Sequence, residues 1–69
     1  MCRSIKQLRS ADRPASDEEI REAALQFVRK ISGYRKPSKA NEAVFDEAVE
    51  DIAVVSRRML DSLRVGARA

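Results

Sequence analysis

Two predicted helices meet at the sequence RKISGYRKPSK, residues 29–39. Gly33 can adopt the left-handed backbone conformation that commonly ends a helix. Pro37 disfavours helical geometry in the residue before it, and Ser38 is a typical N-cap for the following helix, with Asn41 as the alternative cap. The stretch therefore predicts a short turn between two helices. It also carries five basic residues and no acidic one.

The residues before the turn predict a helix over residues 16–32. Ser16 and Glu19 have the spacing of a capping box, in which each side chain accepts a hydrogen bond from the backbone N–H of the other residue. Apolar residues at helical spacing follow, namely Ile20, Ala23, Ala24, Phe27, Val28 and Ile31. The first helix is therefore amphipathic, with one face available for burial.

The residues after the turn predict a longer helix over residues 38–65. Its apolar residues are Val44, Phe45, Ala48, Val49, Ile52, Val55, Met59, Leu60 and Leu63. No glycine or proline interrupts this pattern before Gly66. At about 1.5 Å per residue the second helix spans about 42 Å, against about 26 Å for the first.

A short connection between two amphipathic helices makes them antiparallel neighbours. The register about the turn pairs Phe27 with Phe45, Ala24 with Ala48 and Ile20 with Ile52. In this register the first helix ends before it covers the last apolar residues of the second.

The uncovered end of the second helix carries Met59, Leu60 and Leu63. The nearest apolar residues that could cover it are Ile5 and Leu8, in an N-terminal arm and linker at residues 1–15. The predicted architecture is therefore all-α, an antiparallel hairpin of a short and a long helix with the arm packed across the end of the long one. Residues 66–69 are expected to form a tail.

The small size of the chain limits its core. With 69 residues it is at most a single small domain, residues 1–69, near the size at which one core supports folding alone. Apolar residues make up 43% of the chain, but it has only three aromatic residues and no Trp. We therefore expect a homodimer in which two hairpins form a four-helix bundle, or a protein partner that covers the remaining apolar surface.

Residue types that catalysis and metal binding require are scarce. The chain has no His and one cysteine, Cys2, so it can assemble neither a zinc site nor a Ser/His or Cys/His pair. We interpret Cys2 as a small apolar side chain rather than a reactive thiol. Glu42, Asp46 and Glu50 could attract Mg²⁺, but a solvated acidic face is the simpler interpretation. We expect no enzymatic activity, no cofactor and no metal.

No run of about 18 apolar residues is present, and the opening Met-Cys-Arg-Ser-Ile-Lys lacks the hydrophobic segment of a signal peptide. These observations predict a cytoplasmic protein without contact to a membrane. The same opening, the segment from Ala23 to Ser38, and Asn41-Glu42-Ala43 with Phe45 resemble a family of small prokaryotic proteins classed as a domain of unknown function. The likeness covers roughly Met1 to Leu63. It implies a bacterial or archaeal cytoplasmic protein of one domain, with no assigned activity, cofactor or partner.

Basic residues gather in the arm, at Arg3, Lys6 and Arg9, and in the turn. Cations in the turn could contact phosphates, and the tyrosine beside them could stack on a base. The candidate nucleic-acid-binding residues are Arg29, Lys30, Tyr34, Arg35, Lys36 and Lys39. The sequence thus favours a non-enzymatic protein that contacts RNA or DNA phosphates through the turn between its helices.

The simpler interpretation of the charges themselves is that they pair within the fold and provide solubility, since the net charge is only +3. Each helix is acidic first and basic last, which suits its dipole and an antiparallel arrangement. The acids of the second helix that would face the turn are Glu42, Asp46, Glu47, Glu50 and Asp51. At the other end Asp17, Glu18, Glu19 and Glu22 would lie near Arg57, Arg58 and Arg64. The second function left open is a helical module for dimerisation or protein interaction.

Overall fold

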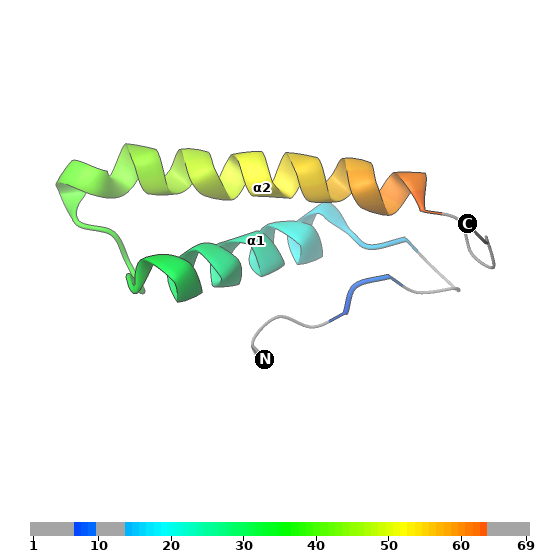
Figure 1. Cartoon of the computed structure of the whole chain (residues 1–69), viewed down its shortest axis with the longest axis horizontal. Coiled ribbons are helices and arrows are strands. Elements are labelled where there is room, and N and C mark those ends of the chain that lie inside the picture. Colours follow the sequence, from blue (N-terminus) through cyan, green and yellow to red (C-terminus); the bar gives the residue numbers. More distant parts are fainter. Residues whose placement is uncertain (1–6, 10–13, 64–69) are drawn as a thin grey trace.

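The computed structural model describes residues 7–9 and 14–63 of the chain. These residues contain two α-helices, α1 (Asp17–Ser32) and α2 (Glu42–Ser62), and no strand. A single 3₁₀ turn, η1 (Lys39–Asn41), directly precedes α2. The helices lie side by side and run in opposite directions, and α2 extends past the first residues of α1 (Figure 1). The predicted all-α hairpin is confirmed.

The start of α1 has the predicted capping box. The Ser16 Oγ accepts from the Glu19 N–H at 3.1 Å, and the Ser16 N–H donates to the Glu19 Oε1 at 2.9 Å. Ser16 itself is extended, with φ −77° and ψ 160°, so the chain changes direction at this residue. Acidic residues fill the first turn and suit the positive end of the helix dipole.

The end of α1 depends on Gly33. This residue has φ 79° and ψ −2°, and its N–H donates to the Arg29 carbonyl at 3.0 Å. A Cβ added here would meet nothing within 4 Å, so the backbone conformation rather than a lack of space favours glycine. The Tyr34 N–H then donates to the Ser32 Oγ at 3.1 Å.

The bounds of α2 differ from the predicted helix over residues 38–65. Neither Ser38 nor Asn41 makes a side-chain capping bond, and the α-helix begins only after η1. The helix ends at Ser62, where the prediction is wrong by three residues, and Leu63 is extended with ψ 145°. No basic residue in the last turn favours the negative end of the dipole, and the Ser62 hydroxyl donates to the Arg58 carbonyl of its own helix at 2.8 Å.

A cluster of buried residues lies between the helices, in the half of the hairpin next to the turn, and Ala15 and Ile20 are buried separately near the start of α1. The buried residues of the cluster are Ala24, Val28, Phe45 and Val49, with Leu25, Ala48, Ile52 and Ala53 packed against them. Phe27, which we predicted beside Phe45, is 43% exposed and lies outside this cluster. The prediction is wrong at this position. Val28 follows Ala24 at a spacing of four and shares its face, whereas Phe27 lies about 100° from Val28 around the helix axis.

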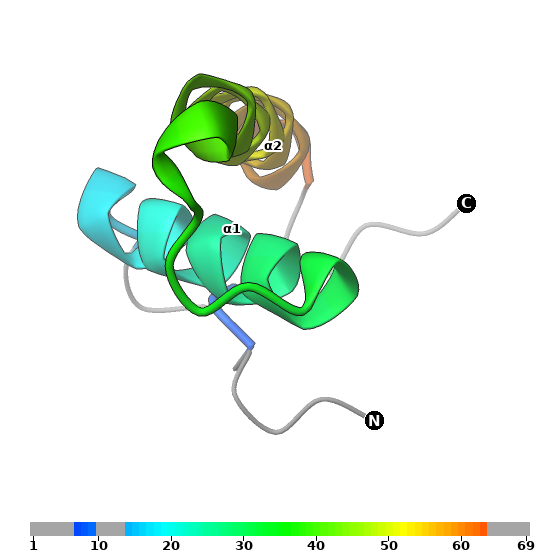
Figure 2. The same cartoon turned by 90° about the vertical axis from the view of Figure 1, so that its left-hand side faces the viewer.

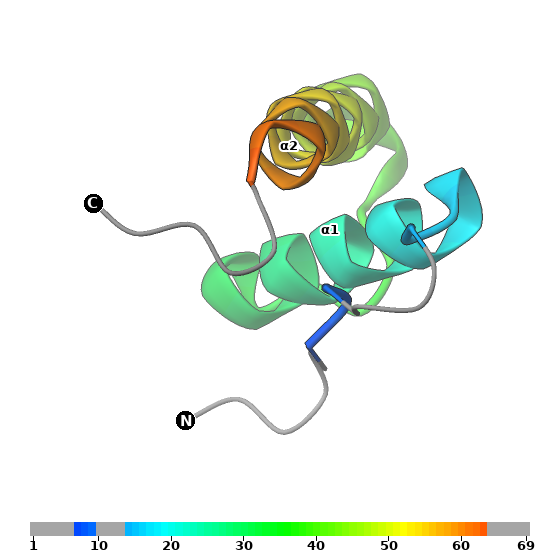
Figure 3. The ribbon, with the colours of Figure 1, turned by 90° about the vertical axis from the view of Figure 1, so that its right-hand side faces the viewer.

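The described part of the N-terminal arm, residues 7–9, does not lie across the end of α2 as we predicted. Ile5 falls outside the described residues, and Leu8 is half-buried. In Figures 1, 2 and 3 residues 7–9 lie on the side of α1 that faces away from α2. Met59 and Leu63 accordingly remain 52% and 48% exposed. Ala15, directly before the N-cap of α1, is buried.

Candidate functional site

One ion pair joins the middle of the two helices. Arg21 of α1 donates to the carboxylate of Glu50 of α2, and both side chains are exposed. The hydrogen bond to Glu50 and the charge of that carboxylate raise the pKa of Arg21. Exposed pairs of this kind contribute little to the stability of a fold. The pair nevertheless shows that the side of α1 with Arg21 and the side of α2 with Glu50 form the same side of the hairpin.

A second set of contacts surrounds Arg57, near the start of α1. Its guanidinium donates to the Asp17 Oδ1 at 2.6 Å, to the Asp61 Oδ1 at 3.1 Å and to the Ala15 carbonyl at 2.9 Å. The hydrogen bonds to Asp17 and Asp61 raise the pKa of Arg57. The predicted proximity of Asp17 and Arg57 is confirmed. The Ala15 carbonyl was not foreseen, because a pattern of side chains gives no information on backbone acceptors.

The opposite end of the hairpin holds the basic turn. Arg29, in the last turn of α1, donates its Nε–H to the Arg35 carbonyl at 2.9 Å. This bond fixes the path of the backbone where it leaves the helix. Because only the Nε–H is used, both terminal nitrogens of the Arg29 guanidinium keep their donors for a ligand.

The cations of the turn differ from those elsewhere in the fold. Among residues 7–9 and 14–63, no carboxylate lies within ion-pair distance of Arg29, Lys30, Arg35, Lys36 or Lys39. Of the α2 acids that we expected to neutralise them, Glu50 instead bonds Arg21. The charge pairing expected at this end of the hairpin is therefore not formed. Except for the half-buried Arg29, these cations are exposed.

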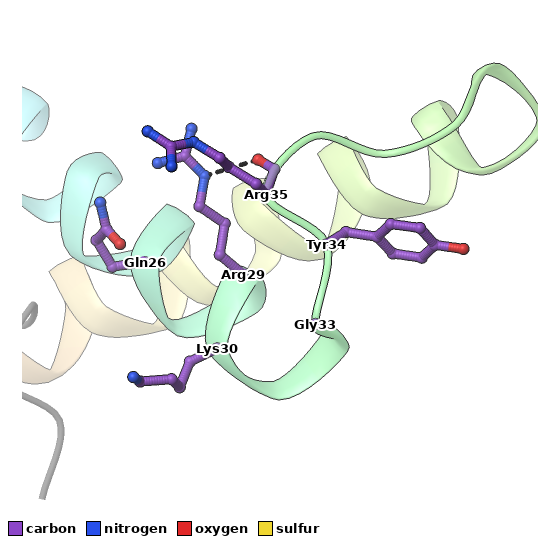
Figure 4. A pocket seen from close by; sticks show the side chains of 6 residues that line it. All are labelled: Gln26, Arg29, Lys30, Gly33, Tyr34 and Arg35. Carbon is purple, nitrogen blue, oxygen red and sulfur yellow. Dashed lines mark hydrogen bonds between the residues drawn. The ribbon is translucent and has the colours of Figure 1, made fainter.

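An open concavity of about 250 Å³ brings part of the predicted site together. Its lining residues are Gln26, Arg29, Lys30, Gly33, Tyr34 and Arg35. In Figure 4 the side chains of Arg29 and Arg35 start from the helix and from the loop, and their guanidinium groups overlap in this view. Lys36 and Lys39 do not line the concavity, although both belong to the same connection.

Tyr34 lies apart from these cations. Its ring points away from the side chains of Arg29 and Lys30, and it is 43% exposed (Figure 4). Its hydroxyl accepts from the Asn41 Nδ2 at 3.5 Å, at the long limit of a hydrogen bond, and the same nitrogen donates to the Ser38 Oγ at 3.1 Å. Asn41 therefore joins the two ends of the turn instead of capping α2 with its side chain.

The described part of the chain holds neither a cluster of metal ligands nor a membrane span. Residues 7–9 and 14–63 contain no group of three or more Asp, Glu, Cys or His side chains that could hold a metal ion. In the same ranges, neither helix combines the length and the apolar character that crossing a bilayer requires.

The fold and the turn define a small helical hairpin whose connection carries positive charge without a carboxylate partner among the described residues. Residues 1–69 match the family described as uncharacterized conserved protein (DUF2277), and the chain belongs to this family. The resemblance that we drew over roughly Met1 to Leu63 is thus confirmed, and the match extends over residues 1–69. No curated protein and no solved structure matches it.

Proposed function

We propose that the turn between α1 and α2 binds the phosphate groups of a nucleic acid, and that the protein acts by binding rather than by catalysis. The observation that supports this function is the contrast between two groups of cations. Arg21 and Arg57 bond carboxylates, whereas the five cations of the turn have no carboxylate partner among the described residues. Five cations within eleven residues repel one another unless an external anion lies between them.

The chemistry of these side chains suits phosphate oxygens. Guanidinium groups donate two parallel hydrogen bonds to a phosphate, and lysine ammonium groups add flexible point charges. Arg29 is held in place by its bond to the Arg35 carbonyl, so it loses little further freedom when it binds. The exposed ring of Tyr34 offers a surface on which an unpaired base can stack.

The expected binding is driven by the phosphate backbone and depends on salt. Each phosphate that a cation neutralises releases counterions, which contributes about −0.9 to the slope of log affinity against log salt for duplex DNA and about −0.7 for single strands. Such contacts position a protein on nucleic acid without reading its sequence. We therefore expect binding to RNA and DNA with little dependence on base composition.

Fluorescence anisotropy with labelled RNA and DNA oligonucleotides at several salt concentrations tests this function. The double variant Arg35→Gln, Lys36→Gln should have a shallower slope of log affinity against log salt, by about 1 for each phosphate that these two side chains neutralise. The melting temperature should stay nearly constant, since both side chains lie in the connection outside the helices. Arg21→Gln is the matched control, because it removes a cation that already bonds a carboxylate, and its slope should equal that of the unmodified protein.

Two results would contradict the proposal. The first is the absence of binding to either nucleic acid at low salt. The second is an equally shallow slope in Arg21→Gln, which would show that net charge rather than the turn governs binding.

A further inference from the structure

The hairpin exposes large apolar side chains on both helices. Phe27 of α1 and Val44, Val55 and Met59 of α2 are each at least 43% exposed. These side chains are spread along the length of the hairpin and are not confined to one end. Their placement around the helices determines whether they form one continuous surface.

Helical geometry places these residues on the side of the hairpin opposite the ion pairs. In α1, Arg21 and Phe27 stand three residues before and after the buried Ala24, so they flank it on opposite sides. In α2, Val55 and Ala48 each stand two residues from Arg57 and Glu50, roughly 200° around the axis at about 100° per residue. Because Arg21 bonds Glu50 across one side, the other sides of both helices also coincide.

We call this surface the open face, formed by the exposed Phe27, Val44, Val55 and Met59 and by Ala48, which is half-buried at its border with the core. Its α2 residues are spaced symmetrically about the peptide bond between residues 51 and 52. If two copies met with their α2 helices antiparallel, Val44 would lie opposite Met59 of the second copy, and Ala48 opposite Val55. A surface that complements itself in this way fits a two-fold axis, at which each residue pair occurs twice.

The charges beside the open face favour the same arrangement. Glu47 and Asp51 in the first half of α2 and Arg58 in the second half make no ion pair with a described residue. An antiparallel pair of α2 helices brings Glu47 within one helical turn of Arg58 of the second copy. Asp51 lies beside the two-fold axis and faces its own counterpart in the second copy, so the favourable contact is that of Glu47 with Arg58. A parallel pair would place Glu47 beside Glu47 and Arg58 beside Arg58 of the second copy, and such contacts between charges of the same sign are unfavourable.

From this geometry we propose that the protein is a homodimer whose two copies pack their open faces together, with the two α2 helices antiparallel. A second copy is the occupant because both the apolar spacing and the flanking charges of the open face complement themselves. The dimer interface lies on the side of the hairpin opposite the ion pairs. The proposed dimer is therefore independent of the proposed phosphate binding by the turn.

Sedimentation equilibrium tests the dimer with nuclease-treated protein, from about 1 µM to about 1 mM, a range that covers dissociation constants of a typical modest interface. The expected mass is twice that of the 7.8 kDa chain. Val55→Glu should raise the dissociation constant at least about tenfold, since it places a charge in the interface. Val54→Glu is the matched control, because Val54 is the adjacent valine, similarly exposed at 55%, and lies outside the open face.

A charge exchange tests the antiparallel arrangement. Glu47→Arg and Arg58→Glu should each weaken the dimer, and the two changes together should restore it, because opposite charges then face each other again. Circular dichroism at low concentration confirms that each variant remains helical. A single-chain mass at the highest concentration, or an equal effect of Val54→Glu and Val55→Glu, would overturn the dimer. Failure of the double exchange to restore association would overturn the antiparallel pairing.

Discussion

The two halves of the hairpin are held together by different means. Next to the turn, Ala24, Val28, Phe45 and Val49 form the buried cluster, and the nearby cations bond no carboxylate among the described residues. Near the start of α1, Ala15 and Ile20 are buried outside this cluster, and Arg57 in addition bonds three acceptors from both helices and the chain before α1. An arginine is thus available for a ligand where apolar packing already holds the backbone.

The largest expected effect comes from removing the apolar cluster in the half next to the turn. Phe45→Ala should lower the free energy of unfolding by about 3 to 5 kcal/mol, since it deletes a ring that is only 7% exposed. Urea denaturation followed by circular dichroism measures this effect. Phe27→Ala removes the same ring from a position outside the cluster and should cost clearly less in the monomer. Equal effects would show that the two halves do not differ in the way described.

The next effect concerns the backbone of the turn. Gly33→Ala should destabilise the hairpin by about 1 to 2 kcal/mol, because the residue has a positive φ of 79° that a side chain disfavours. Ala40→Gly is the control. It exchanges the same two residue types in the same connection, at a residue whose φ is not positive. Thermal denaturation of both variants measures the difference, and an unchanged midpoint for Gly33→Ala would argue against a left-handed residue at this point.

The smallest effect belongs to the polar contacts at the other end. Arg57→Gln should lower the melting temperature modestly, because it separates α2 from Asp17 and from the Ala15 carbonyl. Arg58→Gln removes the same charge from the adjacent residue, whose side chain makes no ion pair with a described residue, and should leave the melting temperature unchanged. Both should be measured at low protein concentration, where association does not contribute. If the two variants behaved alike, net charge rather than the Arg57 contacts would stabilise this end.

Much of the fold was predictable from local chemistry. Ser16, Glu19 and Gly33 act within a few residues of their positions, so the sequence pattern predicted the bounds of α1 closely. The register was predicted less well, because the apolar residues of α1 cover a broad face and only packing decides whether Phe27 or Val28 points inward. Periodicity likewise did not reveal that α2 ends at Ser62, since Leu63 continues the apolar pattern.

The candidate site was predictable in composition but not in arrangement. The sequence identified the cations of the turn, yet it also suggested that the acids of α2 would neutralise them. Which carboxylate a long arginine side chain reaches depends on the spacing of the two helices, and this spacing brings Glu50 to Arg21. The contact between Arg57 and a backbone carbonyl was invisible for a similar reason, because every residue carries such an acceptor.

The position of the turn also sets the order in which the hairpin can assemble. Arg21 and Glu50 are 29 residues apart in the chain, and Asp17 and Arg57 are 40 apart. Contacts nearer the turn close shorter loops and cost less chain entropy, so the helices should join first around Phe45 and last around Arg57. In the folded state the same gradient predicts that backbone amides exchange with solvent fastest towards Ser62 and slowest beside the buried cluster. The hairpin would then open from its free end while the basic turn keeps its shape.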